Sequence, residues 1–201
     1  KCKLIIMETA VNTTLGYYKL GYYKIHEDAI EPKFSTSGSA CFDLFACLPT
    51  AYTHYPEGTD PPCVSVWNAK NEKIKRFYAQ RWEGNQPSPS LTIEPKERAL
   101  IPTGLVLDIP NGFSVRLHTR SSTSLKKGLI MPNGEGIIDS DYYHECFMML
   151  LNVSDVPVHI KNGEKICQAE LIKTLDFDLT ETKIQPTQST ERVGGFGSTG
   201  V

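Results

Sequence analysis

The chain has 201 residues, 40% of them hydrophobic, and a formal net charge of -2 at pH 7. This length is enough for one domain with a substantial core, and the near balance of charges argues against nucleic acid as a partner. No apolar run reaches the ~20 residues of a membrane-spanning helix, and no signal peptide is recognisable. The composition therefore predicts an ordinary soluble globular protein without a membrane partner.

Cysteine usage bears on the compartment. The sequence has six cysteines with no CxxC spacing among them, at positions Cys2, Cys41, Cys47, Cys63, Cys146 and Cys167. This scatter is typical of free thiols in a reducing environment and not of a disulfide framework or a zinc site. We therefore expect a cytoplasmic protein, in the host cytoplasm if the gene is viral or from a phage, with the nucleus open for a eukaryotic source.

The first part of the chain contains two segments that break the later pattern. Residues 1–21 form an N-terminal extension, and the near-duplicates GYYKL and GYYKI lie around its end, over residues 16–25. Residues 51–90 look like an excursion inserted between strands, and its middle part, VWNAKNEKIKRFYAQRW, predicts a short helix or a hairpin. The basic and aromatic side chains of this part allow binding of nucleic acid by stacking and phosphate contacts. We favour the alternative, in which the excursion lies on the surface and its aromatics pack on the main domain.

The remainder of the chain consists of short apolar segments separated by turns. Residues 91–122 predict three strands broken at Glu94-Pro95-Lys96 and Pro110-Asn111-Gly112, and residues 146–175 predict three more with a turn at Asn162-Gly163. Within residues 114–118 apolar and polar side chains alternate, as in a half-buried strand. Closely spaced strands of this kind predict an all-β barrel or sandwich.

Three polar segments could carry chemistry. GIIDSDYYHE (136–145) places Asp139 and Asp141 on one side if the segment is extended, and a carboxylate beside a substrate can activate water. HTRSSTS (118–124) joins a guanidinium, which pairs with phosphate oxygens, to several hydroxyls. Each segment alone is more typical of a polar turn or loop.

The third segment is GGFGSTG near the C-terminus. It lacks the lysine and the following helix of a phosphate-binding P-loop. Its glycines still allow backbone N–H groups to approach a polyphosphate, and its one aromatic ring could stack on a base. The alternative is a disordered glycine-rich tail.

Taken together, these segments resemble the trimeric dUTPase family (deoxyuridine triphosphate nucleotidohydrolase) over about residues 22–200. Five family motifs occur in order: SACFDLFA (39–46), HTRSSTS (118–124), NGEGIIDSDYYHE (133–145), NGEKICQAEL (162–171) and ERVGGFGSTG (191–200). The resemblance implies a jelly-roll-like β-barrel domain over residues 22–190, a homotrimer with shared active sites, and a flexible arm over residues 191–201 that closes the site. It also implies Mg²⁺-dependent cleavage of dUTP to dUMP and pyrophosphate, which keeps uracil out of DNA and supplies dUMP for thymidylate synthesis.

The resemblance assigns roles residue by residue. Asp139 matches the carboxylate that activates the attacking water, and Asp43 matches an aspartate that acts on the metal through water. The remaining matches contact the substrate: Asn133, Gly136, Ile137 and Ile138 at the uracil, Tyr142 and Phe147 at the nucleoside, Arg120, Ser121, Ser122 and Gln168 at the phosphates, and Arg192, Phe196, Gly197, Ser198 and Thr199 in the closing arm.

Four features depart from the family pattern. Tyr143-His144 replaces the usual Arg-Gly, Cys41 replaces a glycine, Arg192 is one residue closer than usual to the last motif's Gly-Gly-Phe, and the excursion at 51–90 is atypical. Three alternatives stay open within this fold. The first is a dCTP deaminase or a bifunctional relative, although such enzymes lack the closing arm. The second is a regulatory or binding protein that uses the excursion, and the third is a relaxed pyrimidine specificity.

Overall fold

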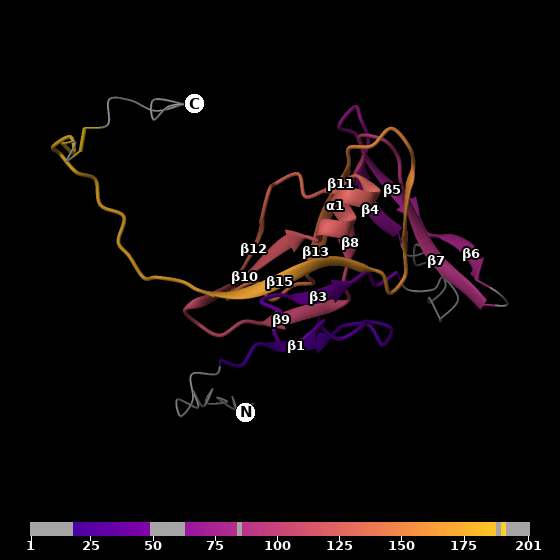
Figure 1. The fold of residues 1–201 in the computed structure, drawn as a ribbon, viewed down its shortest axis with the longest axis horizontal. Coiled ribbons are helices and arrows are strands. Elements are labelled where there is room, and N and C mark those ends of the chain that lie inside the picture. The colour runs from indigo at the N-terminus through magenta and orange to yellow at the C-terminus, as the bar shows by residue number, and fades with distance from the viewer. Residues whose placement is uncertain (1–17, 49–62, 84–85, 188–189, 192–201) are drawn as a thin grey trace, which may run out of the picture.

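The structure is a computed structural model that describes residues 18–48, 63–83, 86–187 and 190–191, with backbone alone for residues 80–87. Almost all of its regular structure is β-strand, in the order shown in Figure 1. The elements are β1 Gly21–Lys24, β2 Lys33–Phe34, β3 Phe42–Phe45, β4 Cys63–Trp67, β5 Lys73–Phe77, β6 Ala79–Glu83, β7 Gln86–Ile93, β8 Arg98–Pro102, β9 Leu105–Asp108, β10 Phe113–Thr119, α1 Ser121–Lys127, β11 Leu129–Ile130, β12 Gly136–Asp139, β13 Phe147–Asn152, β14 Val158–Lys161 and β15 Lys165–Lys173.

Two five-stranded antiparallel sheets form the body of the domain. One has the order β12-β10-β15-β3-β2 and the other β11-β13-β8-β4-β5, with β14-β7-β6 and β1-β9 as smaller sheets. Each large sheet turns alternate side chains inward, so that Val115 of β10, Leu44 of β3 and Leu150 of β13 share one fully buried core. Most sequential strands lie in different sheets, which confirms the predicted all-β, jelly-roll-like class. Within the described ranges, no helix has the length and apolar character needed to cross a membrane.

The strand predictions are confirmed for residues 146–175, whereas residues 91–122 contain parts of four strands and not three, because the chain breaks at Thr103-Gly104 between β8 and β9. Residues 146–175 form β13, β14 and β15 with a turn between the last two strands. In β10 Val115 and Leu117 are buried, whereas Arg116 and His118 are half-buried on the other face. The helix α1 was not expected, because its sequence SSTSLKK has no apolar period. It ends at Gly128, whose left-handed backbone (φ 63°) donates its N–H to the Ser124 carbonyl at 3.1 Å.

The described part of the excursion forms a hairpin, one of the two predicted forms. Strand β4 pairs with β5 and also with β8, so the hairpin extends one of the large sheets at its edge. Asn68 shapes the turn, because its Oδ1 accepts hydrogen bonds from the N–H groups of Lys70 (3.0 Å) and Glu72 (2.9 Å). Strands β4 and β5 of the excursion are therefore part of this large sheet, whereas β6 pairs with β7 in a smaller one.

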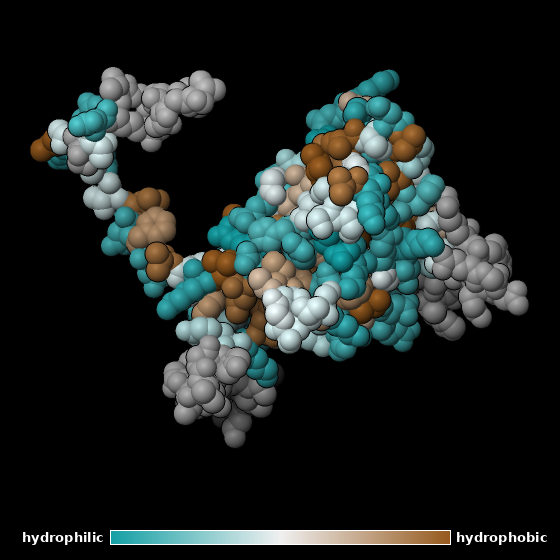
Figure 2. All heavy atoms as spheres, in the orientation of Figure 1, coloured by the Kyte–Doolittle hydropathy of each residue, from teal (hydrophilic) through white to brown (hydrophobic). Residues whose placement is uncertain are grey.

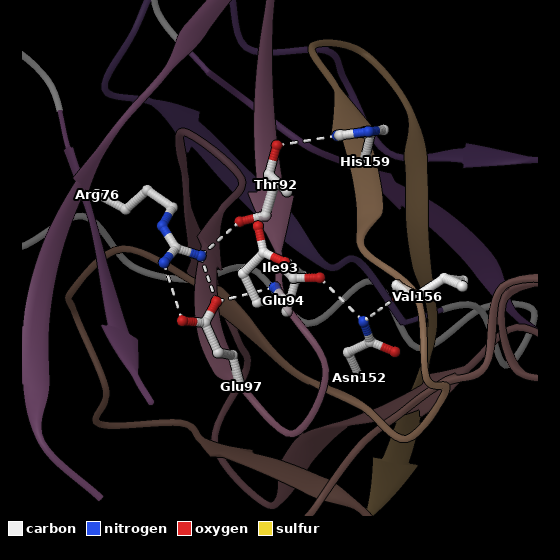
Figure 3. Close-up of polar contacts among 8 residues, drawn as sticks. All are labelled: Arg76, Thr92, Ile93, Glu94, Glu97, Asn152, Val156 and His159. Carbon is white, nitrogen blue, oxygen red and sulfur yellow. Dashed lines mark hydrogen bonds and ion pairs between the residues drawn. The ribbon is translucent and has the colours of Figure 1, made fainter. Parts of the chain in front are cut away.

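Arg76 of β5 fixes this hairpin to the body of the domain, as Figure 3 shows. Its guanidinium pairs with the carboxylate of Glu97, with Nη2 2.8 Å from Oε1, and Nη1 also donates to the Thr92 carbonyl at 2.9 Å. Glu97 is 5% exposed, and it accepts the N–H of Glu94 as well. A buried carboxylate left without its cation is costly, so Arg76 has a structural task and is not available to a ligand.

Candidate nucleotide site

A tight hairpin before β12 builds the first part of the site. Gly134 turns the chain with φ 74°, and Asn133 Nδ2 donates to the Glu135 carbonyl at 2.9 Å. Strand β12 then pairs with β10, with Gly136 opposite Leu117. A Cβ on Gly136 would lie 3.0 Å from the Cβ of Leu117, a tight contact that a larger residue could make only if the neighbouring side chain shifted.

This hairpin forms one wall of a cavity of about 300 Å³. Six of the residues assigned to the nucleoside from the sequence line it: Asn133, Gly136, Ile137, Ile138, Tyr142 and Phe147. They come from the hairpin, from the turn after β12 and from the start of β13. A cavity of this size with backbone donors and acceptors on one wall fits a nucleobase with its sugar.

The rest of the cavity lining was missed by sequence reasoning. It consists of apolar residues and one thiol, namely Leu100, Leu117, Met131, Cys146 and Met149. Their sequence pattern is that of core positions, so no local signal separates them from ordinary packing residues. Only the pairing of strands distant in the chain reveals that they face a cavity.

Tyr142 is held in place beside this cavity. Its hydroxyl donates to the Glu145 carbonyl at 3.0 Å, and its ring meets His144 edge-on at 5.6 Å between centroids. Burial, together with the nearby Cys146 and Glu145, raises the pKa of the Tyr142 phenol, so the hydroxyl stays a donor. His144, which departs from the family pattern, thus packs against the ring of Tyr142, the residue that the third motif assigns to the deoxyribose.

Asp139 ends β12 and is exposed to solvent. The strand stops there, because the N–H of Tyr142 donates to the Asp139 carbonyl at 3.1 Å and closes a turn that contains Asp141. The expectation that both aspartates lie on one side of an extended strand therefore does not apply. The register instead places Asp139 opposite Ser114, whose buried hydroxyl has no hydrogen-bond partner in the described part of the chain.

A second, basic cavity of about 320 Å³ lies where β10 runs into α1. It collects two of the predicted phosphate residues, Arg120 and Ser122, whereas Ser121 lies exposed at the first position of the helix. Three lysines to which the resemblance assigned no role join them: Lys126, Lys127 and Lys165, the last inside the fourth motif. Four cations line this cavity, and two carboxylates pair with three of them, Glu164 in the lining and Asp43 beside it. The remaining excess of positive charge makes the cavity suitable for a polyanion.

Asp43 of β3 organises these cations. Its carboxylate is 3.0 Å from Arg120 Nε and 2.7 Å from Lys165 Nζ, and it accepts the Ser35 hydroxyl at 2.7 Å. Burial alone would raise the pKa of the Asp43 carboxyl, but the hydrogen bonds from Lys165 and Ser35 and the charge of Arg120 outweigh it and lower the pKa. Asp43 is therefore ionised at neutral pH.

Gln168 belongs to the same group through strand register. It lies on β15 between His118 of β10 and Asp43 of β3, one residue on each neighbouring strand. Directly paired residues of neighbouring strands share a face of the sheet. The second and fourth motifs are thus brought together around Asp43.

The hydrogen-bonding capacity of the Asp43 carboxylate fits an indirect contact with Mg²⁺, made through a water molecule bound to the ion. A carboxylate has about four lone-pair sites, and the three contacts named above occupy three of them. One site is left to accept a hydrogen bond from a metal-bound water. The described residues contain no group of three or more His, Cys, Asp or Glu side chains that could hold a metal ion. Mg²⁺ is commonly bound by substrate phosphates and waters with few protein ligands, which agrees with this arrangement.

Asp43→Asn should lower the free energy of unfolding at pH 7 by about 1–3 kcal/mol, because two cations lose their partner. The folded-state pKa of Asp43 is depressed below 3.8, so its contribution is present above that value and is lost as pH falls through the folded pKa. Urea unfolding at several pH values should therefore show a wild-type advantage that shrinks below about pH 4. Asp155→Asn, at an exposed pair, is the control. A difference that is constant with pH would contradict the prediction.

Asp139 and Arg120 lie apart within one chain. Asp139 pairs with Ser114 near the start of β10, whereas Arg120 follows the end of that strand. Six residues of extended chain span roughly 20 Å, which is longer than a triphosphate. One chain therefore does not bring Asp139 and Arg120 to the same phosphates. The remaining predicted residues, Arg192, Phe196, Gly197, Ser198 and Thr199, lie outside the described part of the chain.

Comparisons with known proteins agree with this geometry. Residues 88–200 match the family model described as dUTPase. The chain is 31% identical over 183 residues to the deoxyuridine 5'-triphosphate nucleotidohydrolase of a Hydrogenobaculum species, covering 91% of this chain and 99% of the relative. It is 44% identical over 146 residues to the enzyme of the same name from Methylocella silvestris, covering 72% of this chain and 87% of the relative.

Solved structures show the same fold. The dUTPase of Staphylococcus bacteriophage 80alpha, a point mutant with dUpNHpp, superposes with a TM-score of 0.65 at 19% identity over 92% of this chain and 100% of its own. The dUTPase of Streptococcus mutans has a TM-score of 0.54 at 23% identity, over 79% of this chain and 98% of its own. Because the family model matches residues 88–200, more than half of this chain, and the Hydrogenobaculum relative is 31% identical over almost its whole length, the chain belongs to the dUTPase family.

Proposed function

We propose that this protein hydrolyses dUTP to dUMP and pyrophosphate. The observation that carries the proposal is the cavity beside β12, in which six motif residues converge on a volume that fits a deoxynucleoside. The sequence relatives named above are deoxyuridine triphosphate nucleotidohydrolases, and the bacteriophage 80alpha structure contains dUpNHpp. Both support the same substrate for this chain.

The hairpin supplies a reason for uracil specificity. Backbone groups of residues 136–138 have fixed positions because β12 is paired to β10. They present donors and acceptors to the base edge without side-chain freedom, and the close approach of Gly136 to Leu117 leaves little room for bulk. The ring of Tyr142, held by the Glu145 carbonyl, would cover the deoxyribose and exclude a 2′-hydroxyl.

Asp139 is the proposed general base. It would accept a proton from a water molecule, whose oxygen attacks the α-phosphorus while the bond to the bridging oxygen of the β-phosphate breaks and pyrophosphate leaves. The basic cavity with Arg120 and Ser122 would hold the β- and γ-phosphates and stabilise the charge that develops on the leaving group. Mg²⁺, when bound to the triphosphate, neutralises charge on its oxygens, and Asp43 would orient a water of that ion.

We further propose a homotrimer with shared active sites. Because Asp139 and Arg120 lie at opposite ends of β10, a complete site needs the nucleoside cavity of one subunit and the basic cavity of another. Oligomers of this kind are closed and symmetric, so each subunit can supply both parts, to two different sites. This arrangement explains why the motif residues of one chain form two groups.

The segment after β15 supports the oligomer. It runs away from the body of the domain, and Figure 2 shows apolar side chains along it with no covering atoms of the described chain. Leu175, Phe177 and Leu179 are 76–91% exposed and alternate with Asp176 and Asp178. Alternation with a period of two is typical of a strand with one buried face, so we assign this face to a neighbouring subunit.

The double substitution Leu175→Ser and Phe177→Ser should therefore dissociate the trimer. Light scattering during gel filtration should give a mass near three times 22.4 kDa for the wild type and near 22.4 kDa for the variant. Val156→Ser, at a 61% exposed site on the body, is the matched control and should stay trimeric. A variant that keeps the wild-type mass would remove this segment from the interface.

One assay tests the proposed reaction. Purified protein is incubated with Mg²⁺ and dUTP, dCTP, dTTP or UTP in turn, and pyrophosphate and ammonia are measured separately. We expect pyrophosphate from dUTP and not from the other three, because the hairpin reads uracil and Tyr142 excludes the ribose. Pyrophosphate from several pyrimidine nucleotides would show relaxed specificity. Ammonia from dCTP would replace the proposal with the deaminase alternative.

A further inference from the structure

A third cavity, of about 370 Å³, lies beside the nucleoside cavity and belongs to neither part of the nucleotide site. It is bounded by β4 and by Tyr78, both from the excursion, by the end of β8, by Glu145 and by the segment at His26. Phe147 and Leu100 line it as well as the nucleoside cavity, so the two share a wall. Its volume is within the range of small-molecule sites.

The carboxylate of Glu145 is the main polar group of this third cavity. Its Oε1 accepts the N–H of Gly104 at 2.7 Å, and in the described part of the chain its Oε2 accepts no hydrogen bond. Gly104 is itself tightly enclosed, with φ 68° and space for no side chain, because an added Cβ would lie 2.8 Å from the Sγ of Cys47. The carboxylate is therefore held from one side, with its second oxygen open to a ligand.

The charged side chains that line this third cavity favour a cationic ligand over an anionic one. Among the described residues, no lysine or arginine lines the cavity. Burial, with Glu145 and Asp28 nearby, raises the pKa of the Cys47 thiol to about 11, so this group is uncharged at neutral pH. Burial also raises the pKa of Glu145, which the hydrogen bond from Gly104 and the nearby His26 partly offset. A phosphate would meet an unpaired carboxylate here, whereas a cation would find its partner.

The walls favour a flat apolar body. Val64 is buried, Leu100 and Pro102 are half-buried, and the aromatic rings of Tyr78 and Phe147 belong to the same lining. A planar group carrying two adjacent N–H donors pairs with a carboxylate through two parallel hydrogen bonds, and its ring gains contact with aromatic walls.

We propose that this cavity binds a small planar organic cation of the amidinium type, with Glu145 as its partner, at a site separate from the nucleotide. Heterocycles that present an N–C–N edge with two N–H donors belong to this class. The excursion contributes β4 and Tyr78, so the site depends on a segment that departs from the family pattern. Through Phe147, a ligand here contacts the wall of the nucleoside cavity.

Calorimetric titration of the full chain with benzamidine tests the proposal. We expect binding by the wild type, weakened at least about tenfold by Glu145→Gln, since a charged hydrogen bond contributes about 1.5–3 kcal/mol. The glutamine still accepts from Gly104, so the fold is preserved. Glu31→Gln, on the exposed surface, is the matched control and should bind as the wild type does. Benzamide, the neutral counterpart of the probe, should bind at least about tenfold more weakly for the same reason.

Two further arms locate the site. Ser65→Phe should abolish binding, because the larger side chain fills the cavity from β4 while the carboxylate of Glu145 is unchanged. This variant tests the site independently if Glu145→Gln disturbs the fold. Saturation with dUpNHpp should leave benzamidine bound. Absence of binding, equal binding by Glu145→Gln, or displacement by the nucleotide analogue would each overturn the proposal.

Discussion

Asp139→Asn is expected to reduce kcat for dUTP by about 10²–10⁴-fold while nucleotide binding stays close to that of the wild type. Asparagine keeps the size of the side chain and the end of β12, but it cannot accept the proton of the attacking water. Asp139 is exposed and forms no ion pair within the described chain, so the change costs little stability. Pyrophosphate release measures turnover, and titration with dUpNHpp measures binding.

Asp141→Asn is the matched control for this prediction. Asp141 lies two residues away in the turn closed by the Tyr142 N–H, not on the strand that lines the cavity. It should retain turnover within a few-fold of the wild type. If Asp139→Asn keeps full turnover, or if Asp141→Asn loses as much, then Asp139 is not the base and the proposed reaction needs another group to activate water.

Removal of residues 192–201 is the second large effect that we expect. The segment carries Arg192, Phe196 and the Ser198-Thr199 pair, which the motif assigns to the γ-phosphate and the base. Loss of an arm that closes over the triphosphate removes donors and admits water, and we expect kcat/KM to fall by about 10²–10³-fold. Steady-state pyrophosphate release gives this value.

Two measurements make this result specific. The truncated protein should keep the wild-type mass in light scattering, because the apolar segment around Phe177 is retained. A shorter truncation that removes Val201 alone should be fully active, since it leaves the motif whole. Full activity of the longer truncation would exclude the arm from the mechanism, and a loss of the trimer would show that the arm is structural.

The basic side chains of the excursion have different environments that composition alone does not predict. In the sequence Lys73, Lys75 and Arg76 look equivalent. The register of β5 against β4 divides them, because Lys73 lies over the Trp67 ring on the outer face while Arg76 turns inward to Glu97. Whether a basic side chain is exposed or forms a buried ion pair depends on the face of the strand from which it projects. Strand pairing with residues distant in the chain decides which face that is.

The lining of the basic cavity was likewise predicted only in part. The motifs identified Arg120, Ser122 and Asp43, because these residue types recur at set places in the sequence. They assigned no role to Lys126 or Lys165, which reach the cavity from α1 and from the start of β15. The helix α1 itself was not predicted, since its polar sequence carries no period and its form depends on Gly128 and on the strands on either side.

The sequence by itself determined the fold class and the family, and it supplied the proposed roles of most residues assigned to the site. Period-two alternation is a local property of strands, and the five motifs are short continuous segments whose order can be read from the sequence alone. The tertiary structure alone decided how these segments combine. Pairing β12 with β10 enclosed the nucleoside cavity, pairing β15 with both β10 and β3 brought Gln168 beside Asp43, and the length of β10 separated Asp139 from Arg120. These outcomes depend on contacts between residues far apart in the chain, which no local pattern encodes.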